Sequence, residues 1–164
     1  MLVLVRHALA GEKDRWPWPD DERPLTDVGH EQAAALVHLL AGLAVRAVLT
    51  SPVVRCRQTV EPLARARGLT LRTEPLLEPD GDVAELQRRL LTPDLDGAVL
   101  CTHGEFLDRL LDRWSRSGRV RFSGHRAVGT AKGSAWVVED LGGAAATARY
   151  LTPVTRPHAP GSPA

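Results

Sequence analysis

Two histidines follow short apolar runs of the chain, at positions where imidazole chemistry can operate. His7 comes directly after Arg6 and the run 2–5, and His103 follows the run 97–101 after one threonine. Both runs are typical of strands that are buried on both faces of a sheet. Because ligands bind at the carboxyl ends of strands in open α/β sheets, neighbouring strands would bring the two imidazoles to one rim.

Arg55 is placed to hold an anion at the same rim. Ser51 as N-cap and Pro52 at the first helical position predict a helix start just before it. The first turn of a helix offers free backbone amides and the positive end of the helix dipole. A guanidinium there adds two parallel hydrogen bonds to phosphate oxygens, so the pattern predicts an anion-binding helix start.

Two further cations are candidates for this rim. Arg23 lies in the irregular segment 8–24, whose prolines exclude a helix. In one interpretation this loop lies beside the site with Arg23 pointing in, and in the other it is a surface loop pinned by its tryptophans. Lys132 belongs to the basic segment 115–133, which we expect to be a solvated loop that contributes this lysine to the pocket.

Histidines and arginines gathered at one rim suit the transfer of a phosphoryl group. A neutral imidazole is a competent nucleophile toward phosphorus, and a covalent intermediate divides one difficult displacement into two easier steps. A second imidazole, charged or hydrogen-bonding, would stabilise the charge on the transferring oxygens. A carboxyl group in the loop 78–82 is available to protonate the leaving oxygen. This scheme requires no metal ion and no cofactor.

The chain between these residues alternates strands and helices. We expect strands at 2–5, 47–49, 69–73 and 97–101, helices at 26–41, 52–61, 62–67, 83–91 and 106–114, and a closing hairpin of 135–141 and 145–151. This alternation predicts an α/β protein, a three-layer α/β/α sandwich on a mostly parallel sheet.

Composition limits the classes of partner. The 21 basic and 20 acidic residues give a net charge of +1, so we expect neither nucleic acid nor a membrane as a partner. No stretch approaches the roughly 20 apolar residues of a membrane helix. Cys56 and Cys101 fit free thiols in the cytoplasm. We expect one domain, residues 1–152, and a proline-rich disordered tail, residues 153–164.

Four blocks of the chain, in this order, resemble the motifs of the histidine phosphatase superfamily, which has the phosphoglycerate mutase-like fold. They are Arg6-His7-Ala8, Arg23-Pro24-Leu25-Thr26 with Gly29 and Gln32-Ala33, the stretch from Thr50 to Thr59, and Thr102-His103-Gly104. The first block of the family reads Arg-His-Gly, so Ala8 stands here in place of its glycine, as in many short members.

The resemblance implies a role for each matching residue. His7 would be the nucleophile that carries the phosphoryl group, Arg6 and Arg55 would bind phosphate, and His103 would complete the phosphate pocket. Glu78 lies near the place of the family's proton-donating glutamate. The remaining substrate contacts would come from Arg23, Ala8, Thr102, Gly104 and Lys132.

Two short subtypes of the family fit best. The stretch 77–82 resembles the Leu-x-Pro-x-Gly-Asp stretch of short bacterial phosphohistidine phosphatases, in which the phosphoramidate leaving group has less need of an acid. The stretches 55–62 and 132–137 resemble the phosphatase half that follows a Nudix domain in some actinobacterial nucleotide-sanitising proteins. The implied substrate is therefore a phosphohistidine protein or a phosphorylated small molecule such as a nucleotide. Asp82 stays open as the acid in place of Glu78.

Two interpretations of other classes stay open. The same basic pocket would suit a protein that binds a phosphorylated ligand without turning it over. A metallohydrolase that uses His7, His103, Glu105 and His125 is the other alternative, and activity sensitive to EDTA would support it.

Overall fold

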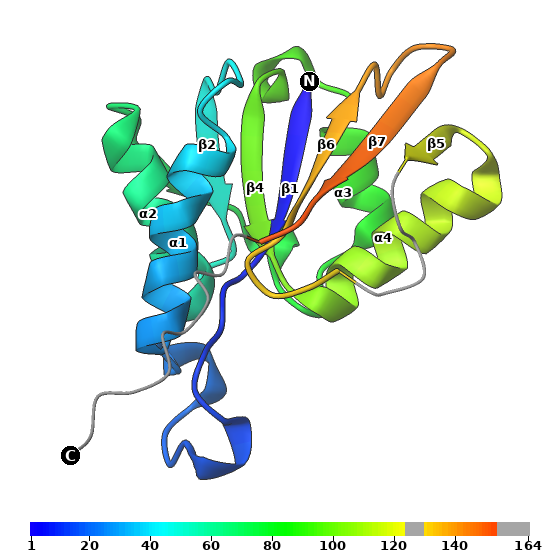
Figure 1. The fold of residues 1–164 in the computed structure, drawn as a ribbon. Helices are drawn as coiled ribbons and strands as arrows, with labels where there is room; N and C mark the ends of the chain where they lie inside the picture. The colour runs from blue at the N-terminus through cyan, green and yellow to red at the C-terminus, as the bar shows by residue number, and fades with distance from the viewer. Residues whose placement is uncertain (124–129, 154–164) are drawn as a thin grey trace.

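A seven-stranded sheet forms the middle layer of the protein, in the order β3-β2-β4-β1-β6-β7-β5 (Figure 1). The computed structural model describes residues 1–123 and 130–153. The strands are β1 (Leu2–Arg6), β2 (Ala47–Thr50), β3 (Leu71–Thr73), β4 (Ala98–Thr102), β5 (Val120–Ser123), β6 (Ala135–Glu139) and β7 (Ala146–Leu151). In the described part of the sheet, β6 alone runs against the other strands.

Four α-helices in the described part of the chain cover the two faces of the sheet. They are α1 (Asp27–Leu39), α2 (Val54–Ala66), α3 (Val83–Arg89) and α4 (Gly104–Ser117), joined by the 3-10 turns η1 (Lys13–Arg15), η2 (Asp20–Glu22), η3 (Pro75–Leu77) and η4 (Pro93–Leu95). Helices α1 and α2 lie on one face and α3 and α4 on the other (Figure 1). The predicted three-layer α/β/α sandwich on a mostly parallel sheet is confirmed.

The pairing of β1 with β4 positions the two histidines. These strands are parallel neighbours in the centre of the sheet, and their register sets Arg6 opposite Thr102. The backbone N–H of His7 donates to the carbonyl of Thr102 at 3.0 Å, which extends the ladder by one residue. His7 and His103 therefore leave the sheet side by side, as the strand ends predicted.

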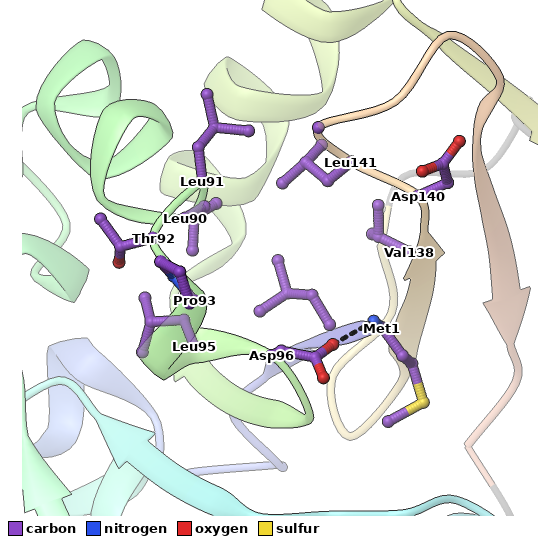
Figure 2. Close-up of a pocket in the computed structure, with 12 residues that line it drawn as sticks. Met1, Leu90, Leu91, Thr92, Pro93, Leu95, Asp96, Val138, Asp140 and Leu141 are labelled. Carbon is purple, nitrogen blue, oxygen red and sulfur yellow. Dashed lines mark hydrogen bonds and ion pairs between the residues drawn. The ribbon is translucent and has the colours of Figure 1, made fainter.

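A cavity of about 280 Å³ lies at the amino-terminal end of β1, opposite the end that leads to the histidines (Figure 2). Five leucines line it together with polar residues, and the lining comes from the start of the chain, the segment after α3 and the end of β6 with the turn that follows. The amino group of Met1 pairs there with a carboxylate oxygen of Asp96 at 2.7 Å. The length of β1 separates this cavity from the two histidines.

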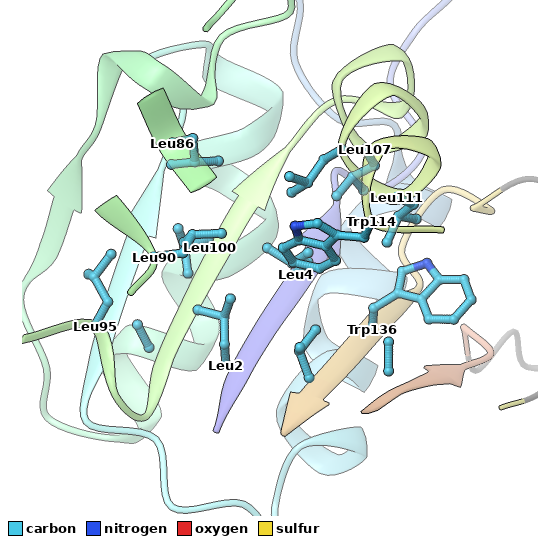
Figure 3. Packing of buried hydrophobic residues seen from close by; sticks show 14 of the residues in the cluster. Leu2, Leu4, Leu86, Leu90, Leu95, Leu100, Leu107, Leu111, Trp114 and Trp136 are labelled. Carbon is cyan, nitrogen blue, oxygen red and sulfur yellow. The ribbon is translucent and has the colours of Figure 1, made fainter. Parts of the chain in front are cut away.

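The core consists of two apolar layers, because alternate side chains of a strand point to opposite faces. Leu4 and Leu100 face α3 and α4, where they pack with Trp114 (Figure 3). Val3 and Val99 point to the other face and pack with residues of α1 and α2. This two-sided burial explains why the runs before the histidines are continuously apolar.

Local features of the chain fix the ends of the helices, and the predicted closing hairpin is confirmed. Thr26 caps α1 by accepting a hydrogen bond from the backbone N–H of Gly29 at 3.1 Å. Asp82 caps α3 by accepting from two backbone N–H groups. Strands β6 and β7 form the closing antiparallel hairpin. In the described segments no helix has the length and apolar character that crossing a membrane demands.

Helix α2 differs from its prediction at both ends. It begins at Val54 with Val53 as its N-cap, so the predicted cap of Ser51 and Pro52 is wrong. It also runs through Pro62 as one helix, although the sequence predicted two. A proline removes one hydrogen bond of the helix, and here the flanking apolar side chains are fully buried against the sheet, which holds the helix together.

The segment predicted as a solvated loop, 115–133, is largely structured where it is described. Its start continues α4 to Ser117, and Gly118 closes that helix in the left-handed conformation, with a φ of 64°. Val120 is buried and begins β5, which pairs with β7 as an edge strand. Residues 124–129 and the predicted disordered tail from residue 154 onward lie outside the described residues.

Candidate active site

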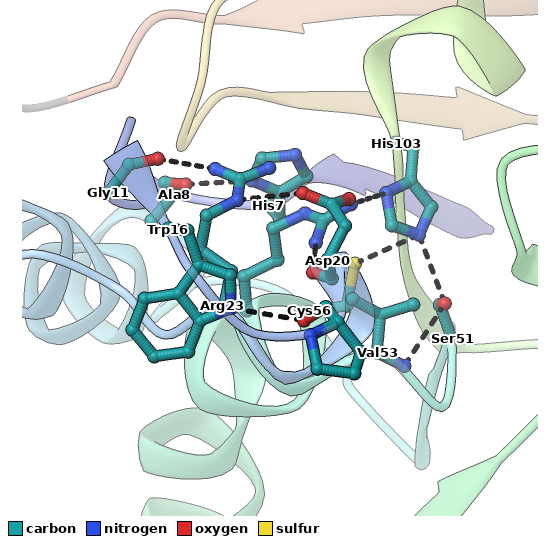
Figure 4. A network of polar contacts seen from close by, with 12 residues as sticks. His7, Ala8, Gly11, Trp16, Asp20, Arg23, Ser51, Val53, Cys56 and His103 are labelled. Atoms are coloured by element: carbon teal, nitrogen blue, oxygen red, sulfur yellow. Dashed lines mark hydrogen bonds and ion pairs between the residues drawn. The ribbon is translucent and has the colours of Figure 1, made fainter. Parts of the chain in front are cut away.

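The two histidines form the centre of a buried polar cluster (Figure 4). The centroids of the His7 and His103 rings are 5.5 Å apart, with an edge-to-face arrangement. His7 is 6% exposed and His103 is fully buried. The cluster therefore opens toward solvent on the side of His7.

The hydrogen bonding of His7 leaves one ring nitrogen available. Nδ1 lies 2.8 Å from the carbonyl oxygen of Ala8, which can only accept, so Nδ1 carries the proton and Nε2 keeps its lone pair. Burial lowers the pKa of His7 to about 3, and the charges of Arg55 and Arg6 add to this effect against the opposing hydrogen bond to Ala8. His7 is thus a neutral imidazole at neutral pH, the form that acts as a nucleophile.

We expect this burial to make the protein less stable in acid. Between the ordinary value of 6.5 and the folded value of about 3, the unfolded chain binds a proton at His7 that the folded chain does not. His7 therefore costs about 2 kcal/mol of stability at pH 5 relative to pH 7.5. His7→Asn lacks this titrating group. The difference in free energy of unfolding between the variant and the wild type should therefore be about 2 kcal/mol more favourable to the variant at pH 5 than at pH 7.5, measured by urea unfolding.

His30, one of the two exposed histidines of α1, provides the control for this measurement. His30→Asn should leave the difference from the wild type the same at both pH values. An equal pH dependence of unfolding in wild type and His7→Asn would show that His7 is not held neutral by the fold.

The fully buried His103 is fixed by partners on both ring nitrogens. A terminal nitrogen of Arg55 lies 3.4 Å from Nδ1 and can only donate, so Nδ1 accepts. Nε2 then carries the proton and points at the hydroxyl of Ser51 at 3.0 Å, with the thiol of Cys56 at 3.5 Å. Ser51, predicted as a helix cap, is instead a partner of the second histidine.

Two arginines have unpartnered donors inside the cluster. Arg6 and Arg55 each keep a buried Nε–H that finds no hydrogen-bond partner in the described part of the chain. Arg55 is 4% exposed, and a terminal nitrogen of Arg6 donates to the carbonyl of Thr130 at 2.5 Å. Buried donors without partners are rare in folded proteins, and the two arginines that carry them are close enough for their charges to act on His7.

Asp20 is a site residue that the sequence analysis missed. Its carboxylate lies 2.9 Å from Nε of Arg23 and 3.1 Å from a terminal nitrogen of Arg55. Although partial burial raises the pKa of Asp20, the hydrogen bond from Arg23 and the charge of Arg55 bring it below its ordinary value. The only signal in the sequence is the spacing of three between Asp20 and Arg23, which is common on protein surfaces.

The loop that carries Asp20 is closed at its base. Ala10 and Leu25 form an antiparallel bridge, and the N–H of Gly11 donates to the carbonyl of Pro24 at 3.2 Å. Arg23 also donates to the carbonyl of Gly11 and is 7% exposed. The inward-pointing interpretation of Arg23 therefore agrees with the structure.

Thr59 joins the first block of the site to α2. Its hydroxyl accepts a hydrogen bond from the N–H of Ala8 at 2.9 Å and donates to the carbonyl of Arg55 at 2.7 Å. Ala8 is fully buried, so it supports His7 through its backbone and offers no side chain to the solvent.

Gly104 is required by the position of Arg6. A Cβ at residue 104 would lie 2.6 Å from Cζ of Arg6, closer than carbon atoms approach without displacement. Gly104→Ala should therefore push the Arg6 guanidinium aside, and we expect kcat/KM for phosphate release to fall about 100-fold, as small misplacements at reacting centres do. Thermal unfolding should change little, because the displaced group is the end of a long side chain.

An exposed glycine serves as the matched control for this variant. A Cβ at Gly42 would meet nothing within 4 Å, so Gly42→Ala should keep the activity of the wild type. Full activity in Gly104→Ala would mean that the Arg6 position is unimportant for turnover.

The remaining predicted residues lie around this cluster. Burial lowers the pKa of the half-buried Lys132, and the charges of Arg6, Arg23 and Arg55 lower it further. Thr102 is fully buried and its hydroxyl donates to the carbonyl of Leu77 at 2.6 Å. Thr102 thus holds the loop in front of Glu78 against the end of β4 and does not face the solvent as a substrate contact would.

Of the residues of the metal alternative, His7 and His103 lie together, and within the described residues no third side chain joins them as a metal ligand would. Glu105 is exposed in the first turn of α4, and His125 lies outside the described residues. Within residues 1–123 and 130–153, no three side chains of His, Cys, Asp or Glu come together as a group that could hold a metal ion. Cys56 and Cys101 are both free thiols and buried.

Comparison with known proteins adds to this picture. The model of the histidine phosphatase superfamily (branch 1) matches residues 2–80. An 8-oxo-(d)GTP phosphatase of Mycolicibacterium smegmatis is 34% identical over 159 residues, which cover 93% of this chain and 48% of that protein. The chain thus spans about half the length of this curated relative.

Solved structures share the whole fold. The protein histidine phosphatase SixA complexed with tungstate matches with a TM-score of 0.71 at 21% identity, over 94% of this chain and 96% of that chain. A putative phosphohistidine phosphatase SixA from Nakamurella multipartitia matches with a TM-score of 0.68 at 28% identity, over 93% and 95% of the two chains. The family model of the histidine phosphatase superfamily (branch 1) thus matches the N-terminal part of this chain, residues 2–80, and the solved structures share the fold of nearly the whole chain.

Proposed function

We propose that this protein is a metal-independent phosphatase that hydrolyses its substrate through a phosphohistidine at His7. The observation that carries the proposal is the state of His7, whose ring is neutral and whose Nε2 makes no hydrogen bond within residues 1–123 and 130–153. The unpartnered donors of Arg6 and Arg55 beside it provide the complement for phosphoryl oxygens.

The reaction runs in two displacements on these residues. In the first, Nε2 of His7 forms a bond to phosphorus while the bond to the leaving group breaks and its electron pair stays on the leaving atom. That atom takes a proton from water or from an acid, a role for which Glu78 is the candidate. In the second, water attacks the phosphoimidazole, gives its proton to solvent, and releases inorganic phosphate and neutral His7.

A phosphohistidine protein is the first substrate we propose. Glu78 is half-buried, and it follows Leu77, whose carbonyl is hydrogen-bonded to Thr102 at the end of β4. In the described part of the chain no hydrogen bond joins the carboxyl group of Glu78 to the site. A phosphoramidate leaving nitrogen accepts a proton readily and has little need of such an acid. The SixA structures, one of them 28% identical to this chain, support the same substrate class.

A nucleoside di- or triphosphate is the second candidate. It is favoured by the 34% identity with a relative named an 8-oxo-(d)GTP phosphatase. The two solved structures reported above are 21% and 28% identical to this chain. The same two displacements would act on its terminal phosphoryl group, with a phosphate oxygen as the leaving atom.

One comparison of substrates tests the proposal. We would measure phosphate release in EDTA from a phosphohistidine protein and from nucleoside di- and triphosphates, including 8-oxo-dGTP. The substrate with the much higher kcat/KM identifies the class. Activity that disappears in EDTA would support the metallohydrolase instead, and the absence of release from all substrates would contradict the proposed reaction.

A further inference from the structure

The carboxylate of Asp20 occupies the donors that a phosphoryl group would use. One of its oxygens accepts from Nε of Arg23 at 2.9 Å, and the other lies 3.1 Å from Nη2 of Arg55. The backbone carbonyl of Asp20 accepts from Nη1 of Arg55 at 2.7 Å. Both terminal nitrogens of Arg55 therefore already contact Asp20.

Asp20 also stands on the solvent side of these arginines. Its side chain is 37% exposed, against 4% for Arg55 and 9% for Arg23. Figure 4 shows its carboxylate between the Arg23 guanidinium and His103. A phosphoryl group that approaches Arg55 from the side of Asp20 therefore meets this carboxylate before it meets the guanidinium.

We propose that Asp20 is a positioning residue that competes with the substrate's phosphoryl group for Arg55. The carboxylate holds the Arg55 fork in place, and it gives up the contact with Nη2 when a phosphoryl oxygen takes that donor. The shorter contact with Nε of Arg23 keeps Asp20 at the edge of the site. This inference rests on the proposed function, because it assumes that Arg55 binds phosphate.

Competition of this kind sets which anions the site retains. A carboxylate beside a bound phosphate dianion repels it, and this repulsion is strong where the neighbouring arginines are buried. Asp20 therefore weakens the binding of every oxyanion, including the phosphate that the reaction releases. In this inference Asp20 lowers the affinity of the site for the phosphate product and at the same time keeps the Arg55 guanidinium oriented.

Titration of inorganic phosphate into three proteins tests the inference. Asp20→Asn keeps an oxygen that can accept from Arg23 and removes the charge, so it should bind phosphate about tenfold more tightly than the wild type by calorimetry. Asp21→Asn is the matched control. Asp21 belongs to the same turn η2, is exposed and makes no ion pair within the described residues, so this variant should bind within twofold of the wild type.

Steady-state kinetics give a second measurement on the same proteins. A competitor for phosphate lowers affinity for substrate and product together, so Asp20→Asn should show a lower KM and a lower inhibition constant for phosphate. A residue that only supports the loop would instead lose kcat with phosphate affinity unchanged or reduced. If Asp20→Asn fails to fold, Asp20→Ser makes the same change of charge.

The outcomes separate this inference from the proposed function. Phosphate affinity in Asp20→Asn that equals or falls below that of the wild type overturns the competition while the phosphatase proposal stands. Wild-type protein that neither binds phosphate nor hydrolyses any substrate overturns the proposed function, and the role of Asp20 falls with it.

Discussion

His7→Ala should abolish hydrolysis of every substrate that the wild type accepts. The variant lacks the only atom that forms the covalent bond in the proposed reaction, so we expect kcat to fall by at least about 10⁴-fold. His7 lies just beyond the end of the ladder between β1 and β4, so alanine should leave that pairing unchanged. The measurement is single-turnover phosphate release, together with trapping of protein-bound phosphate after rapid quenching.

The chemistry of the trapped species identifies the nucleophile. Wild-type protein should carry phosphate that is stable in base and lost in acid, as expected of a phosphoimidazole, and His7→Ala should carry none. His30→Ala, which changes an exposed histidine of α1, is the control and should behave as the wild type. A protein that only binds phosphorylated ligands would keep its affinity in His7→Ala and show no turnover in either form. Turnover that survives in His7→Ala would rule out the covalent route.

The second large effect is expected from Arg55. Its guanidinium contacts His103 and has a buried Nε–H that finds no partner among the residues the structure describes, so we expect it to be preorganised for the charge that develops on the phosphoryl oxygens. Removal of one such donor costs about 10²- to 10³-fold in rate, and we expect Arg55→Ala to lose about 10³-fold in kcat/KM because it also releases His103. Arg55→Lys should recover only part of the loss. Lysine restores the positive charge, but its ammonium group cannot form the two-point contact of a guanidinium.

Arg57 offers a matched control on the same helix. It lies two residues after Arg55 in α2 and is exposed, so Arg57→Ala removes the same charge away from the site. Kinetics of Arg57→Ala should match the wild type, and unfolding of both variants by urea should show that each is folded. Equal kinetics in Arg55→Ala and Arg57→Ala would exclude a role for Arg55 in phosphate binding.

The central part of the site was predictable because it depends on local patterns. An apolar run marks a buried strand, and a polar residue after it must leave the sheet at its edge, so His7 and His103 could be assigned to a rim from the sequence. Their contact required one further step, the choice of β1 and β4 as neighbours, which the pairing confirms.

The features that the sequence predicted wrongly or did not reveal depend on contacts with residues distant in the chain. Ser51 has the local signature of a helix cap, yet its hydroxyl is used by His103, 52 residues later. Asp20 looks like an ordinary member of an acidic loop, and only the packing of α2 beside η2 brings Arg55 to it. Pro62 breaks isolated helices, but tertiary packing carries α2 through it. Local rules cannot weigh these contacts, because their energy comes from the assembled fold.

The closed base of the loop between Ala10 and Leu25 has a consequence for how such proteins diverge. The bridge fixes both ends of the loop beside the site, while the histidines are fixed separately by the ladder of β1 and β4. Insertions, deletions or substitutions between these ends that spare Asp20 and Arg23 would alter the outer edge of the polar cluster and leave the spacing of the two histidines unchanged. Substrate preference could therefore change in evolution while the arrangement of the two histidines stays the same.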